Sequence, residues 1–259
     1  MNDLIANLSA LSGQTEGWLW SAFLVFCRVG AVMALMPGFG EQLVPARIRL
    51  VLTLAFTTVI APAILPQIRS FDGALLLPIG VEVAAGLALG LGLRLFIMAL
   101  QMAGMMMAQA TSLAQVFGGM GPEPQPAIGN LLVAAGLALA VVSGLHVRAA
   151  ELLILSYTIL PPGRVPSPTD MAEWGLAEIA RAFTLAFTLA APFTLAALIY
   201  NVALGVINRA MPQLMVSFVG APALTLGGLV LLAITAPLVL AFWLVEFNAF
   251  LGNPFLVQP

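Results

Sequence analysis

LLLPIGVEVAAGLALGLGLRLFIMALQMAGMMMAQATSLAQV, residues 75–116, is the longest apolar stretch of the chain and decides its fold class. Its only charged residues are Glu82 and Arg94. A helix that crosses the hydrocarbon core of a bilayer needs roughly 20 apolar residues. The stretch is therefore too long for one ordinary span and too short for two comfortable spans joined by a loop. It indicates a membrane protein whose helices depart from the simplest spanning pattern.

The rest of the chain has the same apolar character. Of its 259 residues, 61% are hydrophobic and 8% are charged, whereas soluble domains carry about 25% charged residues. We therefore predict an all-α membrane protein of helical hairpins with about six to eight apolar helices, some of them half-spans. The other apolar runs are separated by breaks rich in proline, glycine or polar residues. They lie at residues 18–36, 50–65, 131–161, 180–206 and 221–250.

Arginines are placed where a simple membrane protein would avoid them. An arginine at the centre of a bilayer costs about 2.5–3.5 kcal/mol, so such residues usually face protein or water. Several helices are therefore expected to pack against protein rather than lipid. Because the arginines are not gathered in alternate loops, they give no orientation of the chain in the membrane. The arginines inside or at the edges of apolar runs are Arg28, Arg94, Arg148, Arg181 and Arg209.

Carboxylates inside the apolar runs allow two interpretations. Glu82 and Glu151 are the best placed, and Glu246 lies near the end of the last run. They could form a relay for ions or protons, or they could pair with neighbouring arginines. Glu82 has no second carboxylate close by, and the five-residue spacing of His146 and Glu151 places them off a shared helical face. These spacings favour ion pairs over a relay.

Catalytic and cofactor chemistry finds little support in the sequence. The serines are scattered, and none stands in a G-x-S-x-G turn. Every aspartate falls in a polar break, so an intramembrane protease is not indicated. A single histidine and a single cysteine, Cys27, make a metal site improbable, and no basic patch is present to bind nucleic acid. We predict a protein that is not an enzyme and that uses no cofactor or metal.

Small residues occur at a spacing that brings helices together. Gly86 and Gly90 form a G-x-x-x-G pattern in the central apolar stretch. Such a pattern lets two helix backbones approach closely. It is common in a sequence this rich in glycine and alanine, so it predicts tight bundling and nothing more specific.

Methionines are concentrated at the end of the same stretch. Six of the twelve lie from Met98 to Met120. Met98, Met102 and Met106 share one helical stripe because they are four residues apart. The stripe is typical of core packing, but it directly precedes the segment VFGGMG. Methionine adapts to irregular partners, so a soft constriction that opens for a chain-like substrate is the alternative.

A polar side runs along the apolar helix expected over residues 178–209. Glu178, Arg181, Thr184 and Thr188 follow one another at steps of three and four residues. The polar side either faces the interior of a bundle or forms a contact surface for another membrane subunit.

The segment GVINRAMPQLMVSFVGAPALTLGGL, residues 205–229, carries a specific pattern. An Asn-Arg pair is followed after two residues by Pro-Gln, and then by Gly-x-Pro before a glycine-containing apolar helix. This segment resembles the signature of the FliR family of flagellar and injectisome export-gate proteins. Further segments stand in the family's order, so the resemblance covers roughly residues 18–250: FCRVGAVMALMPGFGEQLVPARIRL, VEVAAGLALGLGLRL and GLHVRAAELLILSYTILPPG.

The resemblance implies a single polytopic export-gate domain over residues 1–259. It implies a structural, pore-forming component of the flagellar type III protein export gate in the bacterial inner membrane, within the flagellar basal body. Such a subunit closes a helical ring with partners of the flagellar P and Q types, contacts other membrane proteins of the export apparatus, and lets unfolded flagellar subunits pass. A ring whose neighbours satisfy the intramembrane arginines removes the cost that lipid would impose.

The resemblance also implies roles for particular residues. The family's pore-plugging loop corresponds to Val116, Phe117, Gly118, Gly119, Met120 and Gly121. The methionines that would lie near the constriction are Met102, Met105, Met106 and Met107. The signature would form a helix break held by subunit contacts, and proline favours such a break because it lacks a backbone donor. Its residues are Asn208, Arg209, Pro212, Gln213, Gly220 and Pro222.

A stand-alone transporter of small solutes, coupled to protons through Glu82 or Glu151, is the alternative function. Inverted repeats would favour it, and the sequence contains no persuasive internal repeat.

Overall fold

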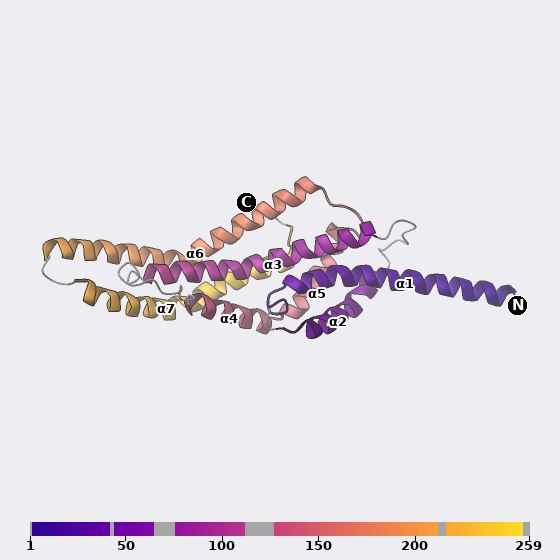
Figure 1. The fold of residues 1–259 in the computed structure, drawn as a ribbon, viewed down its shortest axis with the longest axis horizontal. Coiled ribbons are helices and arrows are strands. Elements are labelled where there is room, and N and C mark those ends of the chain that lie inside the picture. Colours follow the sequence, from indigo (N-terminus) through magenta and orange to yellow (C-terminus); the bar gives the residue numbers. More distant parts are fainter. Residues whose placement is uncertain (1, 42–43, 65–75, 112–126, 212–215, 256–259) are drawn as a thin grey trace. The chain divides into compact units, whose positions relative to one another are not determined.

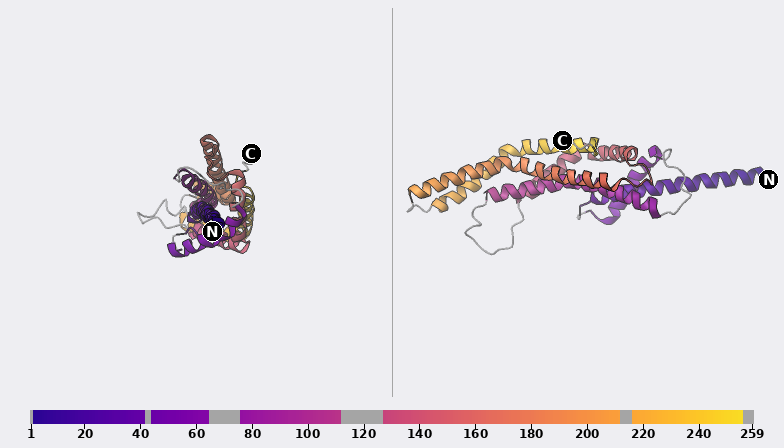
Figure 2. Two further views of the ribbon diagram at one scale, coloured as in Figure 1. Left: turned by 90° about the vertical axis from the view of Figure 1, so that its right-hand side faces the viewer. Right: turned by 90° about the horizontal axis from the view of Figure 1, so that it is seen from above.

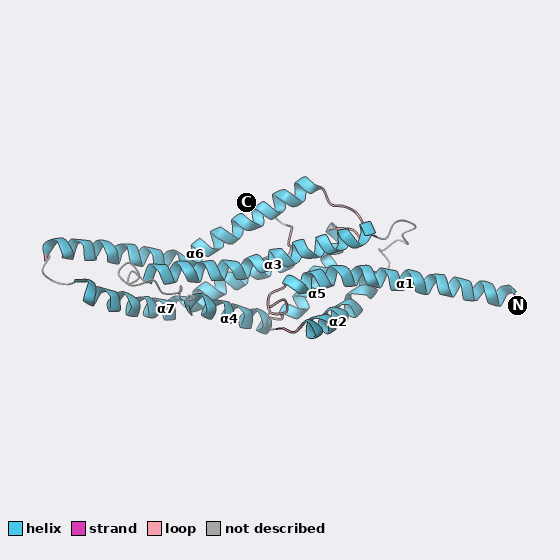
Figure 3. Ribbon diagram, in the orientation of Figure 1, coloured by secondary structure: helices cyan, strands magenta, loops and turns pink. Residues whose placement is uncertain are grey.

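The computed structural model describes residues 2–41, 44–64, 76–111, 127–211 and 216–255, and it describes side chains from residue 17 onward except those of residues 111 and 216–224. These ranges contain α-helices and no strand (Figure 1; Figure 3). The helices are α1 (Asn2–Leu35), α2 (Ala46–Ile64), α3 (Leu76–Thr111), α4 (Ala127–Val142), α5 (Leu145–Ile159), α6 (Pro168–Ala210) and α7 (Val216–Gly252). The prediction of an all-α protein with six to eight helices is confirmed.

Five helices of the described chain are long and apolar enough to cross a membrane: α1 from Gly17, α2, α3, α6 and α7. The helices α4 and α5 are each shorter than a full span, and they would count as a sixth span only if they are taken together. Gly144 precedes α5 with φ +87°, a conformation that glycine adopts without strain. These two helices are the half-spans that the sequence predicts.

The central stretch folds as one uninterrupted helix. α3 has 36 residues, which at 1.5 Å per residue gives about 54 Å, well beyond the roughly 30 Å of a bilayer core. No proline interrupts the helix beyond its first turn, and apolar residues line it all round. The chain therefore resolves the length problem of this stretch with a single long helix rather than with two spans.

The Cα positions divide the chain into two compact units, each described on its own below. Unit 1 comprises Met1–Arg94, Gly144–Ala177 and Ala249–Pro259, and unit 2 comprises Leu95–Ser143 and Glu178–Asn248. Figure 2 gives two further views of the helices that contribute to them.

In unit 1, α1 packs along α2 and along the first half of α3. Gly86 faces the carbonyl oxygen of Arg28 and the methyl of Ala31, and Gly90 lies one turn further along against Val32. A side chain at either glycine would push the two helices apart, so the tight bundling predicted from the G-x-x-x-G pattern is confirmed.

The end of α7 completes unit 1. The indole nitrogen of Trp174, in the first turns of α6, donates a hydrogen bond of 2.7 Å to the carbonyl of Pro254. The ring of Phe255 lies 5.6 Å from that of Trp174, and Phe250 occupies the space that Gly92 leaves open on α3. These contacts hold the last described residues against α3 and α6.

In unit 2, an aromatic group joins α7 to α3. Trp243 stacks on Phe247 at 5.0 Å, and Phe96 meets Phe247 edge-on at 5.6 Å. The indole nitrogen of Trp243 donates to the carbonyl of Phe96 at 2.9 Å, which satisfies a polar group that would otherwise be buried alone. Gly104 of α3 and Gly129 of α4 allow these two helices to touch at the backbone.

The glycine contacts of α3 give a matched pair of substitutions. Gly86→Ala should lower the free energy of unfolding by about 1–3 kcal/mol, because the new methyl overlaps the carbonyl oxygen of Arg28. Gly80→Ala, on the same helix, meets nothing within 4 Å and should be neutral or slightly stabilising. Denaturant unfolding in detergent, followed by circular dichroism, measures both changes. Equal effects of the two substitutions would contradict the packing described.

Candidate functional site in two charged clusters

The first charged cluster, the Arg28 cluster of unit 1, is centred on an ion pair between α1 and α3. Arg28 Nε donates to Glu82 Oε2 at 2.8 Å, and Arg28 Nη2 donates to Glu82 Oε1 at 3.2 Å. Both side chains are 0% exposed. The guanidinium and the carboxylate thus meet fork to fork, the geometry in which such a pair is strongest.

The remaining donors of Arg28 are used by α5 and by the residues that follow it. Arg28 Nη1 donates to Ser156 Oγ at 3.1 Å, and Nη2 also donates to the carbonyl of Leu160 at 2.9 Å. The guanidinium carbon lies 3.8 Å from the centre of the Tyr157 ring. The backbone amide of Gly163 donates to Glu82 Oε1 at 3.2 Å. Four of the five N–H groups of the guanidinium therefore have partners, and the cluster joins α1, α3 and α5.

The Arg28 cluster is neutral and closed, which decides between the two interpretations of Glu82. Each of its carboxylate oxygens already accepts from Arg28, and the pair is sealed from solvent. Glu82 is thus the counter-ion of Arg28 in this cluster. Glu151 is exposed on α5 and makes no ion pair within the described part of the chain. The ion-pair interpretation of Glu82 is confirmed.

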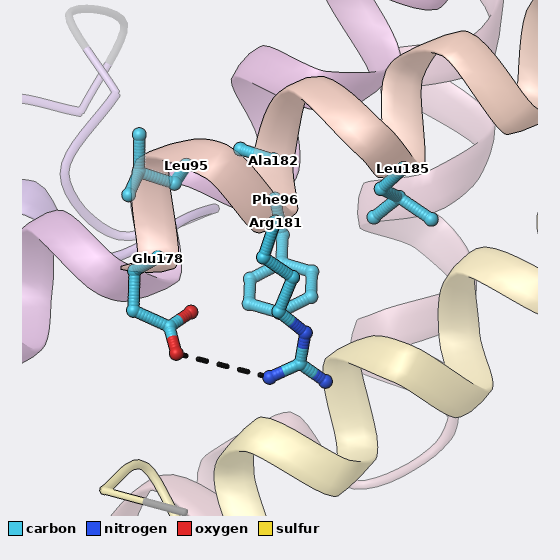
Figure 4. A pocket seen from close by; sticks show the side chains of 6 residues that line it. All are labelled: Leu95, Phe96, Glu178, Arg181, Ala182 and Leu185. Atoms are coloured by element: carbon cyan, nitrogen blue, oxygen red, sulfur yellow. Dashed lines mark ion pairs between the residues drawn. The ribbon is translucent and has the colours of Figure 1, made fainter. Parts of the chain in front are cut away.

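The second charged cluster, the Arg181 cluster of unit 2, joins α6 to α7. Arg181 Nη2 lies 2.8 Å from Glu246 Oε2, and Nη1 lies 3.8 Å from Glu178 Oε1. The guanidinium carbon is 5.5 Å from the centre of the Phe96 ring. Figure 4 shows the carboxylate of Glu178 directed at Arg181, with Phe96 beside the guanidinium. The hollow between them has no room for a water molecule.

The Arg181 cluster differs from the Arg28 cluster in exposure and in charge. The side chains of Arg181, Glu178 and Glu246 are 22%, 4% and 28% exposed. One guanidinium faces two carboxylates, so the cluster carries a net negative charge when all three groups are ionised. Its open side is the outer side of the helix pair.

The polar side predicted on α6 is split between interior and surface. Glu178 is buried, whereas Thr184 and Thr188 are exposed. The hydroxyl of Thr184 donates to the carbonyl of Ala180, and that of Thr188 to the carbonyl of Thr184. Both hydroxyls are thus satisfied within α6. The buried Glu178 fits the first alternative, a polar side that faces the interior of a bundle. The second alternative, a contact surface for another membrane subunit, stays a prediction.

The methionines predicted near a constriction do not share one environment. Met107 is fully buried, which fits core packing. Met105 is 43% exposed, and Met102 and Met106 are partly exposed on the neighbouring faces of α3. The predicted plug residues, Val116 to Gly121, lie outside the described residues.

The helix break predicted in the signature segment falls between the two last helices. α6 ends at Ala210 and α7 begins at Val216, and Pro212 and Gln213 lie outside the described residues between them. Asn208 and Arg209 are exposed in the last turn of α6, where a cation interacts favourably with the helix dipole. Gly220 and Pro222 fall within α7.

Sequence reasoning missed the partners that close the Arg28 cluster. Ser156, Tyr157 and the carbonyl of Leu160 lie far along the chain from Arg28, and Ser156 is separated from it by 128 residues. No motif links them. It also missed a cleft of about 1100 Å³ in unit 1, between the end of α5, the first turns of α6 and Phe255. Within the described residues, no group of His, Cys, Asp or Glu could hold a metal ion.

These features define a class of protein: a multi-pass helical membrane protein in which Arg28 and Arg181 of its apolar helices are paired with glutamates of neighbouring helices. Residues 19–250 match the family described as bacterial export proteins, family 1. The chain belongs to this family, and the resemblance seen in its sequence is confirmed.

Curated relatives match nearly the whole chain, and each of these three is named flagellar biosynthetic protein FliR. The relative from Caulobacter vibrioides is 35% identical over 230 residues, which cover 87% of this chain and 92% of the relative. The relative from Escherichia coli is 28% identical over 245 residues, with 91% of each chain covered. The relative from Aquifex aeolicus is 30% identical over 236 residues, with 87% and 88% covered.

The Arg28 cluster makes a thermodynamic prediction. Arg28→Met leaves Glu82 charged and buried without its partner, so it should destabilise the chain by about 3–5 kcal/mol. The double variant Arg28→Met/Glu82→Met replaces the pair by apolar groups and should recover most of that loss. Unfolding in detergent measures the free energy of unfolding of each variant. A double-mutant cycle then gives the coupling energy between Arg28 and Glu82.

Arg148→Met is the matched control, because Arg148 is exposed on α5 and its loss should change stability by no more than about 0.5 kcal/mol. A double variant as unstable as Arg28→Met would show that the pair is not the source of the effect.

Proposed function

We propose that this chain is a structural, pore-forming component of the bacterial flagellar type III protein export gate. The proposal rests on the comparisons: the export-protein family and the FliR relatives match this chain over almost its whole length. In this role residues 1–259 act as one export-gate domain in the inner membrane, within the flagellar basal body. The chain assembles with P- and Q-type partners into a helical ring and lets unfolded flagellar subunits pass.

A structural role agrees with the state of the charged groups. Four of the five N–H groups of Arg28 are used in hydrogen bonds within unit 1, which suits a group that stabilises the packing of its helices. We propose that the chain is not an enzyme and works without a cofactor or metal. The energy for export then enters through other members of the apparatus.

Pore residues follow from the family resemblance and from the exposure of α3. The plug would comprise Val116, Phe117, Gly118, Gly119, Met120 and Gly121, and the soft constriction Met102, Met105, Met106 and Met107. Met105 supports this assignment best, because a large flexible side chain is left partly exposed where it can contact a passing chain. The exposed Asn208 and Arg209 are suited to meeting a partner subunit at the helix break.

The proposed function is tested by purifying the tagged protein in mild detergent from its native host and identifying the co-purifying chains by mass. We expect two small polytopic partners in a fixed ratio. A protein recovered alone, or only with a second copy of itself, would refute the proposal.

The constriction gives a second test with a matched control. Met105→Ala is made in a host with the complete export apparatus. Because the substitution removes a large side chain from the proposed constriction and so widens it, ion leakage through the membrane should increase several-fold. Leu91→Ala should leave leakage unchanged, although Leu91 is 47% exposed on the same helix. Both positions are exposed, so neither substitution should change stability by more than about 0.5 kcal/mol. A leak that is the same for both variants would remove Met105 from the constriction.

A further inference from the structure

Arg94, the arginine of α3, is not neutralised by any residue that the structure describes. Arg28 and Arg181 each donate to a glutamate of another helix at 2.8 Å. In the described part of the chain, by contrast, nothing accepts a hydrogen bond from Arg94 or forms an ion pair with it. The glutamates of both charged clusters are held by the other two arginines. All five N–H groups of the Arg94 guanidinium are therefore available to a group outside the described residues.

Arg94 lies deep within an apolar helix. It stands close to the middle of the 36 residues of α3, about 26 Å from either end at 1.5 Å per residue. No other charged residue lies between Glu82 and Thr111. Lipid headgroups neutralise arginines near the ends of spanning helices, where the long side chain extends to the membrane surface. The position of Arg94 favours a counter-ion on a neighbouring helix over a headgroup phosphate.

The side of α3 that carries Arg94 is a narrow row of exposed residues within unit 1. Arg94 is partly exposed, and Val81 and Gly90 are buried on the two flanks of the row. The steps of four and three residues along the row give a period of 3.5, which is the seam along which a second helix packs. The exposed residues that precede Arg94 in the row are Gly80, Ala84, Leu87 and Leu91.

The row indicates the shape of its partner, and Arg94 indicates the partner's chemistry. Small residues such as Gly80 and Ala84 let a second helix backbone approach closely, and a methyl added at Gly80 would meet nothing within 4 Å. Charged groups in spanning helices usually pair with one another. A guanidinium pairs best with a carboxylate, because the two can form parallel N–H bonds. An aspartate or glutamate on a closely packed neighbouring helix would supply the missing charge.

From these observations we infer that Arg94 is the contact residue for a helix of another membrane protein. This helix packs along the row and places an aspartate or glutamate on the Arg94 guanidinium. The apolar residues of the row contribute packing, whereas the single charge sets the register of the two helices. The inference rests on the proposed assembly of the chain with other membrane subunits, and it adds to that assembly a contact residue and the chemistry of the partner.

The test places a photo-crosslinking amino acid at Leu91, which is 47% exposed and lies one turn before Arg94. This probe leaves every charge in place. After irradiation of the native host, mass spectrometry of the adducts identifies the attached segment. We expect a second membrane protein, with an aspartate or glutamate within about one helical turn of the attached residue. Adducts to lipid alone, to this chain itself, or to a segment without an acidic residue would overturn the inference.

Exchanging the two charges tests the contact itself. Arg94→Glu should lower the adduct yield at Leu91 about tenfold or more, the loss expected for one charge-assisted contact. Replacing the partner's acidic residue by arginine in the same cells should then restore most of the yield, because the pair is re-formed with its charges reversed. Arg148→Glu is the matched control, because Arg148 is exposed on α5, and the yield should not change. An unchanged yield with Arg94→Glu, or a loss that the exchange does not restore, would overturn the inference.

Two further observations keep the outcome unambiguous. Where Arg94→Glu fails to accumulate in the membrane, Arg94→Gln decides, because it removes the positive charge without adding a negative one, and an unchanged yield would again overturn the inference. If the export partners co-purify but none of them is attached at Leu91, the contact at Arg94 is refuted and the proposed function stands. If no partner co-purifies at all, the proposed function itself fails.

Discussion

The ion pair between Arg28 and Glu82 is the constraint on which unit 1 depends. Neither charge can be buried alone, because an isolated charge in an apolar interior is far too costly. Their fork-to-fork contact fixes α1 against α3, and the additional bonds to Ser156 and Leu160 bring α5 to the same point. The close approach at Gly86 is part of the same arrangement, since it packs against the carbonyl of Arg28.

Two clusters of similar composition differ in exposure. The Arg28 cluster is buried, and it specifies how the helices of unit 1 pack. The Arg181 cluster is partly exposed, and it joins α6 to α7 in unit 2 through the ion pair of Arg181 with Glu246. Both clusters thus use an arginine and a glutamate of different helices to fix how those helices pack.

The sequence predicts the helical membrane class well, because apolar length is a direct signal of spanning helices. The break near Pro212 and the close packing at Gly86 were likewise predictable from local chemistry. The pairing of Arg28 with Glu82 was not predictable, because the two residues are 54 positions apart and no local motif links them. The outward position of Thr184 and the buried position of Glu178 were equally hidden. When apolar residues surround a helix on all sides, its periodicity no longer indicates which face packs inward.

The most direct test of this account is a structure of the native membrane complex, determined by electron cryomicroscopy at a resolution that shows side chains. The account predicts that Arg28 keeps its fork on Glu82 with no partner residue between them. It also predicts that Arg181 stays within about 4 Å of the Glu246 carboxylate, the distance of an ion pair. A complex in which Arg28 or Arg181 reaches a neighbouring subunit instead of its own glutamate would contradict it.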